Sequence, residues 1–293
     1  MNKPTFIIVG AAKAGTTSLY QYLSQHPEIS FSAEKEPHYF VREQKFSFPI
    51  VAKKAEYIDL FSGALSKEVG EASTGYLYFS GTAKKIKNEL PNAKIIMVLR
   101  SPIAVALSMW GHQVREGLEL SSFEEAVDQE ISAGRRSVNG VEYGFNYIQQ
   151  GRIENQVAEY LDIFDRDNVF IADFNELVSD ASAVVKKLYA FLDVDVDFEA
   201  NLSGQFNPSG TPKFSRLHSF LNSKGTWRRI LTAPLRLLFT EEQRHALWAK
   251  IRDKNITKGS AHTISDEARD KLEVLLQDEQ RAMQDYLQKQ TLP

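Results

Sequence analysis

The sequence predicts an α/β protein in which a central parallel sheet is flanked by helices on both faces. Short apolar runs alternate with amphipathic segments over most of the chain, which is typical of strands joined by helical crossovers. The strongest run, residues 94–99 (Lys-Ile-Ile-Met-Val-Leu), is almost continuously apolar, as expected of a strand that is covered on both faces. Residues 5–9 form another apolar run, which is followed by a turn with two glycines and then by a helical pattern.

Further strands are expected at residues 69–73 and 168–174. The first helical pattern stops before Pro27, and a polar amphipathic helix is expected over residues 265–288, beginning with a serine that suits an N-cap. We expect a single domain over residues 1–293, with a core of about residues 1–200 and a helical, basic extension over about residues 201–293. The other expected helices are residues 54–61, 82–90, 103–115, 123–133, 153–164 and 183–192.

Composition places the chain among ordinary soluble globular proteins. Its 293 residues are 43% apolar and 25% charged, which excludes global disorder. The absence of cysteine excludes disulfides, thiolate nucleophiles and cysteine-ligated zinc. A net charge of −3 argues against a nucleic-acid partner. Because we find neither a signal-peptide core nor a run of about 18 apolar residues, we expect a cytoplasmic protein.

Residues 10–17 (Gly-Ala-Ala-Lys-Ala-Gly-Thr-Thr) join the first expected strand to the first helix. The two glycines and the final hydroxyl residue give the outline of a nucleotide-triphosphate loop, but Thr16 stands where such a loop needs its lysine, which is found instead at Lys13. Gly15 permits a turn that a β-carbon would oppose, and the helix N-terminus offers unpaired N–H groups to an anion. A helix cap alone would explain the hydroxyls but not the lysine. The expected anion site comprises Lys13, Ala14, Gly15, Thr16, Thr17 and Ser18.

A second segment, Arg-Ser-Pro-x5-Ser, follows the strongest strand and runs from Arg100 to Ser108. An arginine at the carboxyl end of a parallel strand faces the crevice where open sheets bind ligands, and its planar fork suits a phosphate. This segment resembles the 3′-phosphate motif of sulfotransferases that use 3′-phosphoadenosine 5′-phosphosulfate (PAPS). Residues 13–19, Lys-x-Gly-Thr-Thr-Ser-Leu, resemble the 5′-phosphosulfate loop of the same family.

The resemblance implies a P-loop-like three-layer fold and transfer of a sulfonate group from PAPS to an acceptor. The donor would be released as 3′-phosphoadenosine 5′-phosphate (PAP), and no metal is expected. Charge develops on the bridging oxygen of the donor during such a transfer. Lys13 and the N–H groups of its loop are placed to stabilise that charge.

Residues 34–40 (Glu-Lys-Glu-Pro-His-Tyr-Phe) contain the candidate general base. The string resembles a segment of glycan sulfotransferases, particularly the heparan sulfate type, whose glutamate serves as base. The resemblance therefore implies Glu36 as the base, with Lys35 and His38 lining the junction of donor and acceptor. His38 is the rival base, because histidine's ordinary pKa of about 6.5 suits the task better than glutamate's value of about 4.3. Solvated carboxylates beside a core histidine are the alternative without function.

One position departs from the animal heparan sulfate enzymes. Residues 70–76 align with a segment in which those enzymes usually read Glu-Lys followed by Ser or Thr, and Ala72 replaces the lysine. This points to a bacterial-type relative and away from a heavily anionic glycan. The expected acceptor is an unidentified hydroxyl or amine, on a carbohydrate or glycolipid by preference and on a small hydroxylated metabolite or polyketide as the alternative. The loops expected to form its pocket are residues 44–51, 117–119 and 135–145.

A basic tract without acidic residues lies near the C-terminus, over residues 206–239. Gly210 and Lys213 stand in a segment that weakly resembles the family's late loop over the 3′-phosphate. The rest of the tract, residues 214–239, could contact a membrane surface or an amphiphilic acceptor. A solvated helical face is the simpler reading of the same charges.

Two other classes of protein share part of these patterns. A P-loop kinase would need a lysine beside its loop hydroxyl and a magnesium-binding aspartate after a strand, and Arg100 stands where such an aspartate could follow Leu99. A non-catalytic nucleotide-binding module would keep the anion loop without turning over the donor. Dependence on magnesium separates the first alternative from a sulfotransferase, and turnover of PAPS separates the second. The sequence leaves the oligomeric state open.

Overall fold

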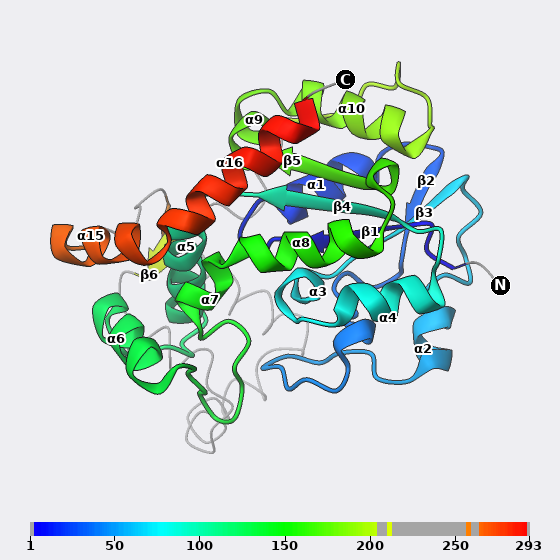
Figure 1. The fold of residues 1–293 in the computed structure, drawn as a ribbon. Coiled ribbons are helices and arrows are strands. Elements are labelled where there is room, and N and C mark those ends of the chain that lie inside the picture. The colour runs from blue at the N-terminus through cyan, green and yellow to red at the C-terminus, as the bar shows by residue number, and fades with distance from the viewer. Residues whose placement is uncertain (1–2, 204–209, 213–255, 259–263, 292–293) are drawn as a thin grey trace, which may run out of the picture.

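The computed structural model describes residues 3–203, 210–212, 256–258 and 264–291. Its centre is a sheet of five parallel strands in the order β2-β3-β1-β4-β5, flanked by helices (Figure 1). The predicted fold class is therefore confirmed. The strands are β1 Phe6–Gly10, β2 Ile29–Phe31, β3 Glu68–Ala72, β4 Lys94–Leu99 and β5 Val169–Asp173.

The two central strands are β1 and β4, which pair with each other in parallel. Every residue of β1 is buried, and only Lys94 of β4 is not. This explains why their sequences are apolar without alternation, since both faces of the sheet are covered at these positions. Sequence reasoning missed β2, because three residues (Ile-Ser-Phe) are too short to show a period.

Helices cover both faces of the sheet. Helix α1 (Thr16–Leu23) packs with α10 (Ala181–Leu192) on one face, and α4 (Thr82–Glu89) packs with α8 (Ile153–Ile163) on the other (Figure 1). Bounds were predicted for α4, α8 and α10, and each of these helices begins and ends within two residues of its predicted bounds. Apart from two C-terminal helices, the other described elements are α2 Lys54–Asp59, α3 Gly75–Tyr78, α5 Pro102–Arg115, α6 Phe123–Ala133, α7 Tyr147–Gly151, α9 Phe174–Ser179, the 3₁₀ turns Tyr39–Val41 and Arg166–Asn168, and an antiparallel pair, β6 Gly210–Pro212 with β7 Ile256–Lys258.

The C-terminal helical region consists of two helices rather than one. Helix α15 (Asp266–Leu275) begins at the predicted N-cap, where the hydroxyl of Ser265 accepts a hydrogen bond from the third helical N–H at 3.2 Å. It is followed by α16 (Gln277–Thr291), which packs against β5 and α8. The break falls at Leu276, which is buried in a second apolar cluster beside α5 and α6, whereas Met283 of α16 is buried in the main core. The predicted helix is thus divided into two helices that are buried in different apolar clusters.

Because the strands are parallel, their carboxyl ends meet at one edge of the sheet. The loop after β1, the residues after β2 and the residues after β4 all start at this edge, and each contains part of the predicted site. Within the described part of the chain, no helix combines the length and apolar character that crossing a membrane requires.

Candidate active site

The loop between β1 and α1 makes the turn predicted from its glycine. Gly15 has a φ of 82° and precedes the first residue of α1. A β-carbon at this position would also lie 3.3 Å from side-chain atoms of Leu177 and Phe174, so both the conformation and the limited space favour glycine. Lys13, two residues earlier, also has a left-handed φ, of 64°. The loop therefore leads directly into the N-terminus of α1, where the anion site was predicted.

Arg100 connects the two predicted donor motifs. Its Nη1 atom donates a hydrogen bond of 2.7 Å to the backbone oxygen of Lys13, and its guanidinium lies over the ring of Phe174, 4.4 Å from the centroid. Ser108 lies two turns into the following helix, α5, and is partly buried. The end of β4 and the loop after β1 are therefore in direct contact through Arg100.

The ammonium group of Lys13 lies among other charges. Burial and the positive charges of Arg115 and Arg100 together lower the pKa of Lys13 to about 8, while the carboxylate of Glu36 opposes the shift. The cationic side chains of Lys13, Arg100 and Arg115 therefore lie near one another in a partly desolvated region. An anion bound there would offset their mutual repulsion, so this set of residues fits a phosphosulfate group.

Glu36 is held by three side chains. Its Oε1 atom accepts from Lys35 at 2.7 Å, and its Oε2 atom accepts from Thr74 at 3.2 Å and lies 3.0 Å from Nε2 of His38. Burial alone would raise the pKa of Glu36, but the hydrogen bond with His38 and the charge of Lys35 outweigh it and lower the pKa to about 2. The side chain is 30% exposed. Glu36 is thus an ionised, accessible carboxylate that also interacts with Lys13.

His38 is completely buried. Its ring stacks on Phe46 at 4.8 Å between centroids and lies 5.3 Å from Phe48. Its Nε2 atom faces Glu36, and its Nδ1 atom lies toward Gly75 without a hydrogen-bond partner in the described structure. Neither ring nitrogen of His38 is therefore exposed on the surface, and Nε2 is within hydrogen-bond distance of Glu36.

Three of the predicted site residues share an unusual backbone conformation. Among the described residues, five that are not glycine have a positive φ, and these include Lys13, Glu36 and His38. For a residue with a β-carbon, the left-handed conformation costs about 1–2 kcal/mol relative to the right-handed one. Such conformations persist where the surrounding structure holds them, and they gather at functional sites.

A family model described as "Sulfotransferase domain" matches residues 3–227. The chain belongs to this sulfotransferase family. A solved structure of a sulfotransferase from Alicyclobacillus acidocaldarius is 32% identical, superposes with a TM-score of 0.64, and is matched over 83% of this chain and 100% of its own. The predicted family and the three-layer fold are therefore confirmed.

The curated relatives are more distant. "Membrane-associated sulfotransferase kil1" of Dictyostelium discoideum is 31% identical over 52% of this chain and 33% of its own length. "Bifunctional heparan sulfate N-deacetylase/N-sulfotransferase 3" of Homo sapiens is 26% identical over 78% of this chain and 25% of its own length. "Heparan sulfate glucosamine 3-O-sulfotransferase 3B1" of Mus musculus is 25% identical over 64% of this chain and 46% of its own length. This sulfotransferase thus spans a quarter to a half of the curated proteins that it resembles.

Two residues of α5 in this sulfotransferase interact with Lys13 but were not predicted from the sequence as site residues. His112 and Arg115 lie one and two turns beyond Ser108, on the same face of the helix. Arg115 donates a hydrogen bond of 2.8 Å to Nδ1 of His112. Burial and the charges of Lys13 and Arg115 together lower the pKa of His112 to about 3, so the imidazole is neutral. The spacing of four and seven residues from Ser108 was the signal that could have identified them.

The predicted acceptor loops differ in their relation to the site. Residues 44–51 contribute the phenylalanines beside His38, and residues 135–145 contribute Tyr143, whose hydroxyl lies 3.1 Å from that of Thr74. Residues 117–119 instead end in Glu119, which forms a buried ion pair with Arg136 at 2.5 Å. The first two loops therefore reach the candidate base, and the third anchors the segment around Arg136.

The late donor segment is only partly described. Gly210 begins β6, which lies beside α5, the helix of Ser108. Of the basic tract over residues 206–239, only residues 210–212 are described, so Lys213 and residues 214–239 lie outside the described residues. In the part of the chain that the structure describes, no group of three or more His, Asp or Glu residues is arranged to hold a metal ion.

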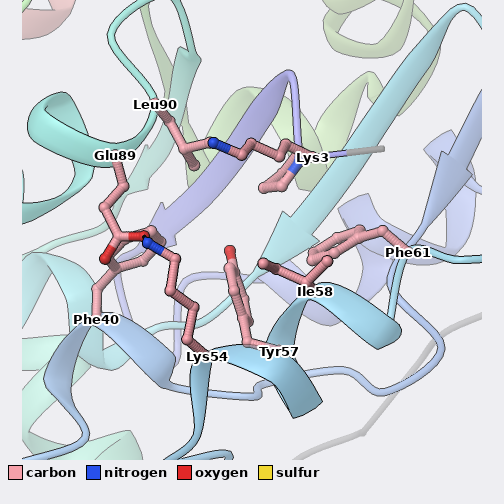
Figure 2. Close-up of a pocket in the computed structure, with 9 residues that line it drawn as sticks. Lys3, Phe40, Lys54, Tyr57, Ile58, Phe61, Glu89 and Leu90 are labelled. Atoms are coloured by element: carbon pink, nitrogen blue, oxygen red, sulfur yellow. Dashed lines mark ion pairs between the residues drawn. The ribbon is translucent and has the colours of Figure 1, made fainter. Parts of the chain in front are cut away.

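A small cavity lies away from this site, near the start of β1. Figure 2 shows Tyr57 and Ile58 of α2 facing it, with the ion pair of Lys54 and Glu89 along one side. Its volume of about 10 Å³ is room for about one water molecule. It contains none of the predicted site residues, and a nucleotide cannot enter it.

Proposed function

We propose that this sulfotransferase transfers a sulfonate group from PAPS to a hydroxyl or amine of an acceptor, in line, with Glu36 as the general base. The observation that supports this most directly is the environment of Lys13. Its backbone oxygen is bonded by Arg100, and its ammonium group interacts with Glu36. The residues proposed for the two phosphate sites and for the base therefore come from three segments and meet at one lysine.

The donor site is assigned to this chain's own groups as follows. The loop N–H groups and the hydroxyls of Thr16, Thr17 and Ser18 would bind the 5′-phosphosulfate, with Ala14 and Gly15 supplying backbone. Arg100 and Ser108, with Gly210 and Lys213, would bind the 3′-phosphate. When bound, PAPS supplies the sulfonate and leaves as PAP. Lys13 would stabilise the charge that develops where the donor releases its group.

Geometry favours Glu36 over His38 as the base. The carboxylate is 30% exposed, whereas the imidazole is completely buried and already bonded to it. A pKa of about 2 keeps Glu36 ionised throughout the neutral range, so it can always accept a proton. The same low pKa makes early proton transfer uphill, so the acceptor should lose its proton only after the sulfonate has begun to bond. His38 and Lys35 would fix the direction of the carboxylate.

The acceptor is proposed to be a carbohydrate or glycolipid. The support is the similarity to curated proteins whose names include heparan sulfate and carbohydrate sulfotransferases, at 25–26% identity. One observation favours the second candidate, a small hydroxylated metabolite or polyketide. Phe48, which is 40% exposed, and Phe46 stand beside His38, and such an apolar surface suits an uncharged acceptor. A cytoplasmic location and the absence of a nucleic-acid partner stay predictions.

The test is transfer from labelled PAPS to a panel of uncharged oligosaccharides, glycolipids, sulfated glycans and phenols. We expect a labelled product from at least one class, formed at the same rate with and without a chelator. Binding of PAP without any transfer would favour a non-catalytic nucleotide module. Phosphate transfer from ATP that depends on magnesium would favour a kinase.

A further inference from the structure

A buried carboxylate lies behind the proposed base, and the proposed reaction does not use it. Glu71 belongs to β3 and has no exposed surface. Its Oε1 atom accepts a hydrogen bond of 2.7 Å from Ser73, and its Oε2 atom accepts one of 2.5 Å from Tyr57. The hydroxyl of Tyr76 bonds the same carboxylate. Three hydroxyls therefore converge on one fully buried acidic side chain.

Two of these hydroxyls also hold the backbone of the segment that carries the base. The Oγ atom of Ser73 accepts a hydrogen bond of 3.0 Å from the N–H of His38. The Oη atom of Tyr76 accepts one of 3.3 Å from the N–H of Phe40. Each hydroxyl thus lies between the buried carboxylate and one amide of the segment.

The amide of Glu36 completes the series, because it donates to the carbonyl of Ala72, the residue after Glu71, at 2.9 Å. The amides at positions 36, 38 and 40 are therefore all tied to the end of β3 and the residues that follow it. This attachment matters because Glu36 and His38 both have left-handed backbone conformations, which non-glycine residues keep only where the surroundings hold them.

The charge of the carboxylate determines the direction of these hydrogen bonds. An ionised carboxylate can only accept, so Ser73 and Tyr76 must each point their single proton at Glu71. Their lone pairs are then left for the backbone N–H groups. A glutamine side chain at this position would donate to one of the hydroxyls and remove that constraint.

We propose that Glu71 is a positioning residue of the transfer reaction: its carboxylate orients the hydroxyls of Ser73 and Tyr76, which hold the backbone that presents Glu36. The inference rests on the proposed function, in which Glu36 is the base. Glu71 acts through these hydroxyls and contacts neither donor nor acceptor.

The ionisation of Glu71 gives this role a pH dependence. Burial and the charge of Glu36 together raise the pKa of Glu71 to about 7, although the hydrogen bonds from its hydroxyl partners oppose the rise. The other titratable groups that face it are Tyr57 of α2, Tyr76 of α3 and Tyr160 of α8. The form that can only accept is therefore produced as pH rises through neutrality. The kcat should rise over the same range, and Glu71→Gln should lose this rise.

The experiment compares two hydrogen bonds on the same carboxylate. Ser73→Ala removes the hydroxyl between Glu71 and His38. Tyr57→Phe is the matched control, since it removes an equally buried bond to Glu71 whose donor belongs to α2. Ser73→Thr restores a hydroxyl. Hydrogen exchange of a peptide covering residues 34–42, the affinity for PAP and the kcat are measured for each purified, folded variant.

For Ser73→Ala we expect faster exchange in this peptide and a kcat lower by about 10- to 100-fold, because small misplacements of a catalytic group have effects of this size. The affinity for PAP should stay within about threefold, and Ser73→Thr should recover most of the kcat. Tyr57→Phe should lower the Tm without either effect. Unchanged exchange in Ser73→Ala, or an equal loss of kcat in both single variants, would overturn the positioning role. If the wild type transfers no sulfonate, the proposed function fails by itself, and the exchange data still decide whether the network holds the segment.

Discussion

Arg100 donates a hydrogen bond of 2.7 Å to the backbone oxygen of Lys13, although the two residues are 87 positions apart in the chain. The arginine proposed for the 3′-phosphate therefore also fixes the loop proposed for the phosphosulfate. One guanidinium can do both, because it carries five N–H donors and this bond uses one of them. Donor affinity and the position of Lys13 should consequently change together when Arg100 is replaced.

Arg100→Ala should weaken binding of PAP by about 10- to 150-fold, the effect of losing a charge-assisted contact of about 1.5–3 kcal/mol. Ser108→Ala should weaken it by less, since its hydroxyl is uncharged. Isothermal titration calorimetry measures both. Arg281→Ala, which removes an equal charge from the exposed face of α16, is the control and should leave the affinity unchanged. Unaltered affinity in both site variants would show that the 3′-phosphate binds elsewhere.

Binding of PAP at pH 8 should take up protons. Burial and two arginines lower the pKa of Lys13 to about 8, so about half of the free protein carries a neutral lysine at this pH. A bound phosphate favours the charged form and raises this pKa, which requires uptake of up to about half a proton per site. Calorimetry in buffers of different ionisation enthalpy measures the uptake. It should vanish in Lys13→Met and near pH 6.5 in the wild type. Equal uptake in Lys13→Met would place the titrating group elsewhere.

Lys13→Ala tests whether the lysine acts in the transition state. Its proposed partner gains charge chiefly during transfer, so the loss should fall mainly on kcat and much less on donor affinity. Steady-state kinetics at saturating PAPS, with an acceptor found by the panel, separates the two effects. A normal kcat with a raised KM for PAPS would instead make Lys13 an anchor for the nucleotide.

Glu36→Gln keeps the size and most hydrogen bonds of the side chain but cannot accept a proton. We expect kcat to fall by about 10²- to 10⁴-fold while binding of PAP changes little. His38→Asn should have a smaller effect, because the buried ring orients Glu36 and does not reach the acceptor. Both variants are measured across pH 5 to 9. A nearly normal Glu36→Gln beside an inactive His38→Asn would make His38 the base.

The raised pKa of Glu71 should also make the stability of the fold depend on pH. Its pKa is raised to about 7, well above that of a glutamate in the unfolded chain, so the folded state binds the proton more tightly. This group therefore destabilises the fold progressively as pH rises from about 4.5 to 7, by up to about 3 kcal/mol. The Tm of Glu71→Gln relative to wild type should increase over this range, as differential scanning calorimetry can measure. A constant difference would show that Glu71 is ionised throughout.

The sheet and the turn before α1 could be predicted because their signals are local, and the proposed donor residues were assigned from equally local motifs. β4 is apolar along most of its length, Arg100 follows it directly, and the glycine turn before α1 is written in consecutive residues. Contacts across the chain left no such signal. The inward position of Glu71 depends on Tyr57 of α2, fourteen residues away, and a strand covered on both faces has no alternation to reveal it.

The same limit explains the other omissions. The break at Leu276 depends on an apolar cluster formed by α5 and α6, so the sequence of the helix itself gave no sign of it. The role of Thr74 beside Glu36 arises only when β3 ends next to the loop of residues 34–40. His112 could have been found from helical spacing, but its neutral state depends on Arg115 and on burial.

The left-handed conformations of Lys13, Glu36 and His38 have a consequence for attempts to engineer this protein. A library screened only for heat resistance should accumulate glycine or asparagine at these three positions, because glycine has no β-carbon and the short polar side chain of asparagine tolerates the left-handed region. Each such gain would remove a side chain on which the proposed chemistry depends. Thermostable descendants are therefore better sought on the exposed faces of α6, α15 and α16, with residues 13, 36 and 38 excluded from mutagenesis.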